Sequence, residues 1–267
     1  MAARFWFGGT GTWSDTAHWG TASNGVGAPA SVPGSADTAT FDANSGAGTC
    51  TVDIDFTVTS LTTSASATSI DFGTQSPTFS TAWTDAGSAA HTLTFGTGTF
   101  HFTGTSGFPI AFSGASTTVS AASATLSFEG TSTSYRTLTL GANTYGTISL
   151  GANTSLGGFE ISGAATFTNF QISQPNYVAV AANITITNAP SWAGSSLTSM
   201  IFFGSNSSSV RTVTISNAGG TANYVALRNI TFGTNAITST NWLNFGNVTN
   251  AGSASPPSSG GGYVIGG

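Results

Sequence analysis

The chain has 267 residues, of which 39% are hydrophobic and 11% aromatic, and this is enough to bury a continuous core. Only 5% of the residues are charged, and the formal net charge is −5, whereas an ordinary soluble domain is about 25% charged. Four Lys and Arg in total exclude a basic patch that could neutralise phosphates, so we expect no nucleic-acid partner. No stretch is long and apolar enough to cross a bilayer, so we expect no membrane partner.

The polar residues are rich in Thr, Ser, Asn and Gly, which predicts a nearly neutral surface. A soluble monomer normally relies on mixed surface charge to stay in solution. This composition therefore indicates that much of the surface is covered in an assembly.

Residues 1–45 are expected to form an aromatic cap and attachment segment. They bring three tryptophans close together in sequence, namely Trp6, Trp13 and Trp19. Ser14 or Asp15 can cap a single helical turn, and such a turn brings the second and third tryptophans toward the same side.

A loop and a strand follow this aromatic start. Residues 28–37 contain Pro, Gly and Ser and predict a loop, and residues 38–42 predict a returning strand. Together with the tryptophans they predict a compact cap that closes one end of a stack of strands.

Residues 46–250 are expected to form a β-rich body, because one pattern recurs along them. Two apolar residues flank any residue, and Gly, Ser or Thr usually follows at once. Copies lie at residues 70–73, 93–96, 100–103, 110–113, 126–128, 138–141, 148–151, 159–162, 184–187, 213–216, 230–233 and 243–246. Side chains two apart on a strand point to the same face, so each copy predicts a short strand that buries two residues and then turns.

Two all-β architectures are compatible with short strands at irregular intervals. A parallel β-helix, or solenoid, gives irregular intervals when its turns vary in length, and we favour this fold. An antiparallel β-sandwich or jelly roll gives similar strands, usually with turns every 8 to 12 residues or so, and it stays open as the alternative. No segment has the apolar spacing of a long amphipathic helix.

Residues 251–267 form a Pro-, Gly- and Ser-rich arm that ends in a short apolar run. Such an arm cannot fold alone and gains order by lying against a neighbour. We predict that this run and the aromatic start contact another subunit or a larger particle into which the chain assembles, through Phe5, Trp6, Phe7, Trp13, Trp19, Tyr263, Val264 and Ile265.

Few residues are arranged for chemistry. Asp53 and Asp55 lie two apart, and paired carboxylates can cleave glycosides, but a strand over residues 52–56 would leave both in water. Asp37 and Asp42 lack the usual calcium-loop pattern, and the three His are too scattered for a metal site. We therefore assign no catalytic, cofactor-binding or metal-binding residue, and we expect a protein that is not an enzyme and needs no cofactor.

The remaining candidates are isolated residues. Trp83, Trp192 and Trp242 would stack on sugar rings if exposed, but we expect buried anchors, because aromatic residues chiefly supply core area. Cys50 is the only cysteine, so no internal disulfide forms, and we expect a buried free thiol.

The aromatic start also resembles a known group of proteins. Residues 4–19 and 31–43 resemble the start of tailed-bacteriophage virion proteins that have a Trp- and Gly-rich head and a Ser-, Thr- and Gly-rich β body. The segment from Gly8 to Trp19 is also similar to repeats in the β-helical passenger regions of bacterial autotransporters. Because the sequence holds neither a signal peptide nor a C-terminal membrane barrel, we favour the phage group. The likeness covers about the first 45 residues, and beyond them it is one of composition.

The phage resemblance implies a component of the virion, synthesised in the host cytoplasm and located in the extracellular particle. The implied function is that of a non-enzymatic, homotrimeric capsid decoration or cement protein that binds itself and a major capsid or tail protein. One alternative is a tail or fibre component, or adhesin, that recognises a host surface glycan. A further alternative is a polysaccharide depolymerase that uses Asp53 and Asp55.

Overall fold

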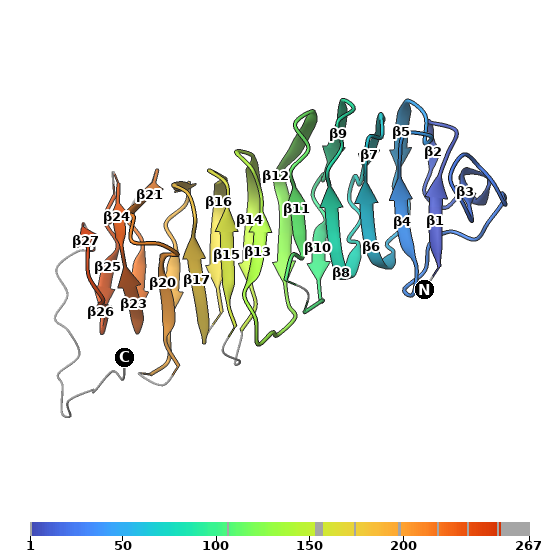
Figure 1. The fold of residues 1–267 in the computed structure, drawn as a ribbon. Coiled ribbons are helices and arrows are strands. Elements are labelled where there is room, and N and C mark those ends of the chain that lie inside the picture. The colour runs from blue at the N-terminus through green and yellow to red at the C-terminus, as the bar shows by residue number, and fades with distance from the viewer. Residues whose placement is uncertain are drawn as a thin grey trace.

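The computed structural model describes residues 2–105, 107–152, 157–173, 175–196, 199–217, 219–233, 235–249 and 251. These residues form an elongated rod of stacked strands, with the N-terminus at one end (Figure 1). The helix described among them is a single 3-10 turn, η1 (Thr16–His18). Among the described strands every pairing is parallel except that of β1 with β3 (Trp19–Gly20). The predicted parallel β-helix is therefore confirmed, and the antiparallel sandwich is excluded.

The strands stack on three faces of the rod, and each coil of the chain visits the faces in the same order. The first face contains β1 (Ala3–Trp6), β4 (Thr38–Phe41), the later parts of β6 (Thr57–Thr63) and β8 (Thr78–Asp85), β11 (Ile110–Phe112), β13 (Arg136–Thr139), β15 (Phe159–Ser162), β17 (Asn176–Val180), β20 (Ile201–Ser205), β23 (Val225–Arg228) and β26 (Leu243–Asn244).

The second face contains β2 (Gly11–Thr12), β5 (Gly48–Thr51), β7 (Thr68–Asp71), β9 (His91–Thr94), the first parts of β12 (Thr117–Phe128), β14 (Thr144–Leu150) and β16 (Thr166–Ile172), β18 (Ile184–Ile186), β21 (Arg211–Ile215), β24 (Ile230–Phe232) and β27 (Val248–Thr249). The third face contains the first parts of β6 and β8, β10 (Thr99–Phe102) and the later parts of β12, β14 and β16, followed by the separate sheet of β19 (Ser191–Ala193), β22 (Thr221–Asn223) and β25 (Thr238–Thr240).

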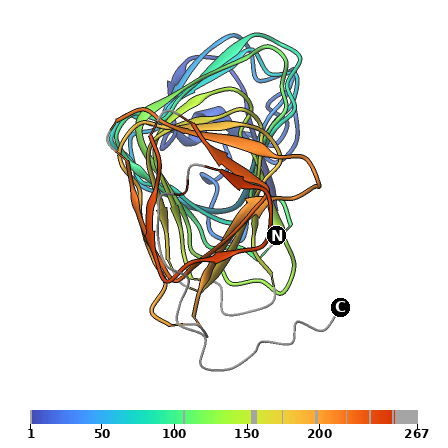
Figure 2. The ribbon, with the colours of Figure 1, turned by 90° about the vertical axis from the view of Figure 1, so that its left-hand side faces the viewer.

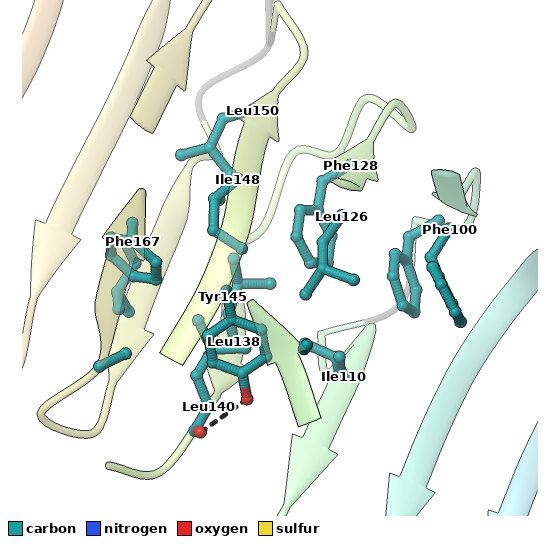
Figure 3. Close-up of a cluster of buried hydrophobic side chains, with 14 of the residues drawn as sticks. Phe100, Ile110, Leu126, Phe128, Leu138, Leu140, Tyr145, Ile148, Leu150 and Phe167 are labelled. Atoms are coloured by element: carbon teal, nitrogen blue, oxygen red, sulfur yellow. Dashed lines mark hydrogen bonds between the residues drawn. The ribbon is translucent and has the colours of Figure 1, made fainter. Parts of the chain in front are cut away.

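Inward side chains from successive coils lie one above another and fill the rod. On the first face the register aligns Ala39, Leu61, Trp83, Ile110, Leu138, Ile161 and Val180, all of them buried. Figure 2 shows the coils around one interior, which these side chains occupy. In the close-up of Figure 3, the Tyr145 hydroxyl donates a hydrogen bond to the Leu140 carbonyl at 2.8 Å, so the polar end of this buried ring is paired.

The recurring doublets behave as predicted, with one exception. Both apolar residues are buried in every copy from residue 70 to residue 232. In the last copy Leu243 is only partly buried and Phe245 is 41% exposed. Phe245 lies outside its short strand, so strand alternation does not direct it inward.

Glycine and asparagine shape the corners between faces. Gly96 has φ +63°, and a Cβ placed on it would lie 1.7 Å from the carbonyl oxygen of Gly73 in the preceding coil. Asn188 donates to Asn169 at 2.8 Å and accepts from Asn217 at 3.0 Å, so amides form a ladder from coil to coil. Such ladders satisfy polar groups where the backbone turns and leaves the sheet.

The N-terminal segment closes one end of the rod, as its tryptophans predicted. Asp15 caps η1 by accepting from the Ala17 N–H at 2.9 Å, and Trp13 and Trp19 meet edge to face at 4.9 Å. Trp13 also stacks on Phe56, with ring centroids 3.9 Å apart.

The cap changes the interpretation of the predicted contact residues. Trp6, Trp13 and Trp19 have no exposed surface, so they cannot contact another subunit while the cap is folded. Phe5 and Phe7 are partly exposed and stay available for contact. The predicted contacts Tyr263, Val264 and Ile265 lie outside the described residues.

Candidate functional site

The two acids proposed for glycoside cleavage lie in a corner, and the expectation of a strand over residues 52–56 is wrong. This segment has no strand, and Ile54 is 39% exposed. Asp53 accepts from the Ser14 hydroxyl at 2.5 Å and from the Ser14 N–H at 3.0 Å. Burial by itself would raise the pKa of Asp53, but its hydrogen bonds together lower it. Asp55 accepts from the Ser76 N–H at 2.7 Å. Each carboxylate therefore ties its corner to a different neighbouring segment.

The acids considered for calcium also accept hydrogen bonds from backbone N–H groups. Asp37 accepts from the N–H groups of Ala2 and Gly34, at 3.2 and 3.1 Å, and Asp42 accepts from the Asn44 N–H at 2.8 Å. Over the residues that the structure describes, no three His, Cys, Asp or Glu side chains gather closely enough to hold a metal ion.

The tryptophans of the body are anchors of the core, as expected. Trp83 and Trp192 are buried, and Trp192 Nε1 donates to the Phe170 carbonyl at 3.1 Å. Trp242 is partly buried against the same core. Cys50 is a buried free thiol, and burial raises its pKa, so it stays protonated.

A buried ionic cluster lies where the first face turns into the second. The Asp85 carboxylate accepts from the hydroxyls of Thr63 and Thr117 and from the Gly87 N–H, and His91 Nε2 lies 3.4 Å from its Oδ1. Burial by itself would raise the pKa of Asp85, but these donors together lower it. The carboxylate in turn raises the pKa of His91, which favours the imidazolium form. Because the side chains of Asp85 and His91 are fully buried, the cluster affects the stability of the fold.

Arg136 is a second buried charge. Its guanidinium lies 3.9 Å above the ring of Phe159, the next residue in its inward column, and burial lowers its pKa to about 10. Within the described part of the chain none of its three guanidinium nitrogens has a hydrogen-bond partner. The cation–π contact is therefore its main compensation for lost hydration.

The outer side of the first face carries the most exposed group of aromatic residues in ring contact. Tyr135 meets Tyr177 edge to face at 5.3 Å, Tyr177 stacks with Phe202 at 6.0 Å, and Phe202 meets Phe245 at 6.3 Å. All four rings are between 36% and 45% exposed. Tyr177 and Phe202 occupy the same register position on β17 and β20, so the fold itself aligns them.

A second column of side chains runs beside these rings. The register aligns Glu160, Ala179, Gly204 and Arg228 on consecutive coils. Ala179 and Gly204 are too small to fill the space between the two charged residues. The result is a depression with aromatic residues along one side, which we call the aromatic trough, lined by Tyr135, Glu160, Tyr177, Phe202, Arg228 and Phe245.

Two hollows make up the trough. One of about 300 Å³ lies among Tyr177, Phe202, Arg228 and Phe245, and one of about 240 Å³ lies beside Glu160. Tyr177 and Arg228 line both hollows, so the two are adjacent.

The sequence patterns did not identify this site. Phe202 stands in an unbroken apolar run with its neighbours on both sides, and alternation cannot tell which member of such a run faces outward. Phe245 belongs to a doublet that predicts an inward side chain, and Glu160 has no second acid near it in the sequence. The alignment of Tyr177 with Phe202 on neighbouring coils is the signal that marks the site, but the sequence by itself does not give the register between coils.

No family model, no curated protein and no solved structure matches the chain. In the described residues no helix has the length and hydrophobicity of a membrane span. The structure therefore defines a parallel β-solenoid with an aromatic N-terminal cap, and the function is a matter for proposal.

Proposed function

We propose that the chain is a non-enzymatic structural protein of a tailed-bacteriophage virion, a homotrimeric capsid decoration or cement protein that stabilises the shell. The observation that carries the proposal is the contrast between interior and exterior. The core is apolar along the rod, while only 13 of the 267 residues, nine Asp and Glu and four Lys and Arg, are charged.

The outer positions of the short strands illustrate this exterior. Thr92 and Thr94 on β9, and Thr137 and Thr139 on β13, alternate with buried residues. Uncharged Thr side chains on the outside of a sheet do not repel a copy of the chain, and covering them with a neighbour costs little desolvation. The resemblance of the first 45 residues to phage virion proteins supports the same function.

The depolymerase alternative gains no support from the positions of its acids. Asp53 and Asp55 accept hydrogen bonds from different segments and hold corners of the coil. A tail or fibre component is the alternative location in the particle.

The proposal is tested by assembly and by particle stability. We expect purified protein to run as a trimer in light scattering, and particles that lack it to release their genome at lower temperature or milder osmotic shock. A monomer whose absence leaves particle stability unchanged would refute the proposal. Antibody-labelled particles in the electron microscope distinguish shell from tail.

A further inference from the structure

The aromatic trough has the size of a small-ligand site and is too small for a subunit interface. An aromatic side chain has about 200 Å² of surface, and these four rings are each 36–45% exposed. Together they therefore show on the order of 300 Å². A stable protein interface needs about 800 Å² on each partner. A contiguous patch of a few hundred Å² on a monomer is often functional.

The backbone around the trough favours a ligand other than a peptide. Strand β17 is paired with β15 and β20, and β20 with β17 and β23, so these strands have no free edge on this face. An extended peptide lying here would find no ladder partner for its own N–H and C=O groups. A ligand whose polar groups are hydroxyls and carboxylates has no such backbone to satisfy.

The polar groups of the trough are suited to such a ligand. Arg228 is exposed, and it has no hydrogen bond or ion pair with any described residue, so its planar guanidinium is free to hold a carboxylate through two hydrogen bonds. Glu160 accepts from the Asn206 amide at 2.9 Å, which fixes the carboxylate while leaving its other oxygen as an acceptor for a hydroxyl.

From these features we propose that the aromatic trough binds an oligosaccharide that carries a carboxylate. Sugar rings present C–H groups that pack on the aromatic carbons of Tyr177 and Phe202, and their hydroxyls remain free to reach Glu160. The carboxylate of an acidic sugar residue pairs with Arg228. The inference goes beyond the structural function and does not depend on where the chain lies in a particle.

The repeat of the solenoid matches the repeat of such a ligand. Glu160 and Arg228 are three coils apart in the register, and neighbouring strands are about 4.8 Å apart, so the two backbones are separated by about 14 Å. The strand spacing is close to the length of one pyranose residue. A chain of a few sugar residues along the rod axis therefore places one residue beside each coil.

The experiment uses the labelled full-length chain on a printed array of acidic and neutral glycans, followed by titration calorimetry with the best acidic oligosaccharide. We expect bound spots among the uronate- or sialate-bearing glycans. Tyr177→Ala, Phe202→Ala and Arg228→Gln should each weaken binding by about tenfold or more, as expected for central contact residues. The controls Ile54→Ser and Arg4→Gln remove an exposed apolar side chain and a cation outside the trough, and they should bind as the parent does.

Each outcome bears on the proposal. Circular dichroism must first show that the variants melt like the parent, because a misfolded variant would also lose binding. If the parent chain binds no glycan more strongly than the Tyr177→Ala, Phe202→Ala double variant does, the proposed site is wrong. If neutral glycans bind as strongly as acidic ones, and Arg228→Gln does not change that binding, the ligand does not need a carboxylate and this part of the proposal is wrong. Displacement of the glycan by an extended proline-rich peptide of equal or higher affinity would show that the trough is a peptide site.

Discussion

Replacement of Trp13 by Ala tests whether the tryptophans of the N-terminal segment build the cap or bind another subunit. Trp13 has no exposed surface, stacks on Phe56 at 3.9 Å and meets Trp19 at 4.9 Å, and its backbone carbonyl accepts from Trp19 Nε1 at 2.8 Å. The substitution therefore removes the centre of an aromatic cluster and leaves a cavity under the first coils.

The expected cost follows from area and polarity. A buried Trp removes about 200 Å² or more from water, worth roughly 5 kcal/mol at about 25 cal/mol per Å², and this is an upper value because unfolded chains bury part of that surface. The Trp13 Nε1 hydrogen has no partner in the described structure, so its loss relieves part of the cost. We expect Trp13→Ala to destabilise the cap by about 4 kcal/mol, within the usual range for Trp→Ala. Trp13→Phe keeps the stack on Phe56 and should cost about 1–2 kcal/mol.

The assay is hydrogen exchange combined with thermal unfolding. Each coil of a solenoid contacts mainly its neighbours, so a damaged cap loosens the nearest coils first. We expect Trp13→Ala to lose amide protection in β1 and β4 while β17 and β20 stay protected, with no change in oligomer mass at low temperature. Wild-type protection in β1 together with a changed oligomer mass would show that Trp13 is a contact residue and would refute the reasoning.

Three further predictions concern buried polar groups. Arg136→Met should leave the free energy of unfolding unchanged or raise it by about 1–3 kcal/mol in urea titration, because it removes a buried cation without hydrogen-bond partners in the described residues; a loss of several kcal/mol would indicate that the cation is well compensated. The pKa of His91 is raised above 6.5 and that of Asp85 is lowered below 3.8, so the His91 contribution is complete below about pH 6.5 and is lost as pH rises through its folded pKa. The Asp85 contribution is present above pH 3.8 and is lost as pH falls through its folded pKa. Tm should therefore be highest at mildly acidic pH and should fall as the pH rises through the folded pKa of His91. His91→Gln should flatten that fall; an unchanged profile in the variant would contradict this account. Asn188→Ala breaks two ladder hydrogen bonds and should lower the free energy of unfolding by about 1–2 kcal/mol. Asn188→Asp keeps the acceptor and loses the donor, so its free energy of unfolding should lie between those of the parent and Asn188→Ala.

The sequence alone determined most of the short strands and the side chains that they bury. Doublets such as Leu138–Leu140 predict short strands and their buried side chains, because the side-chain period of a strand is two and does not depend on its partner. The cap was also predictable, since Asp15 and its turn lie within a few residues of the tryptophans they position.

Only the tertiary structure decided which residues share the outer surface. Tyr177 and Phe202 are neighbours because β17 and β20 lie in register, and that register depends on the lengths of the intervening corners. The same dependence misled the interpretation of Asp53 and Asp55, where a corner replaced the expected strand. Local patterns predict which side of a strand is buried. A site on the outer face depends on the spatial alignment of coils that are far apart in sequence, and the trough around Arg228 is defined only by that alignment.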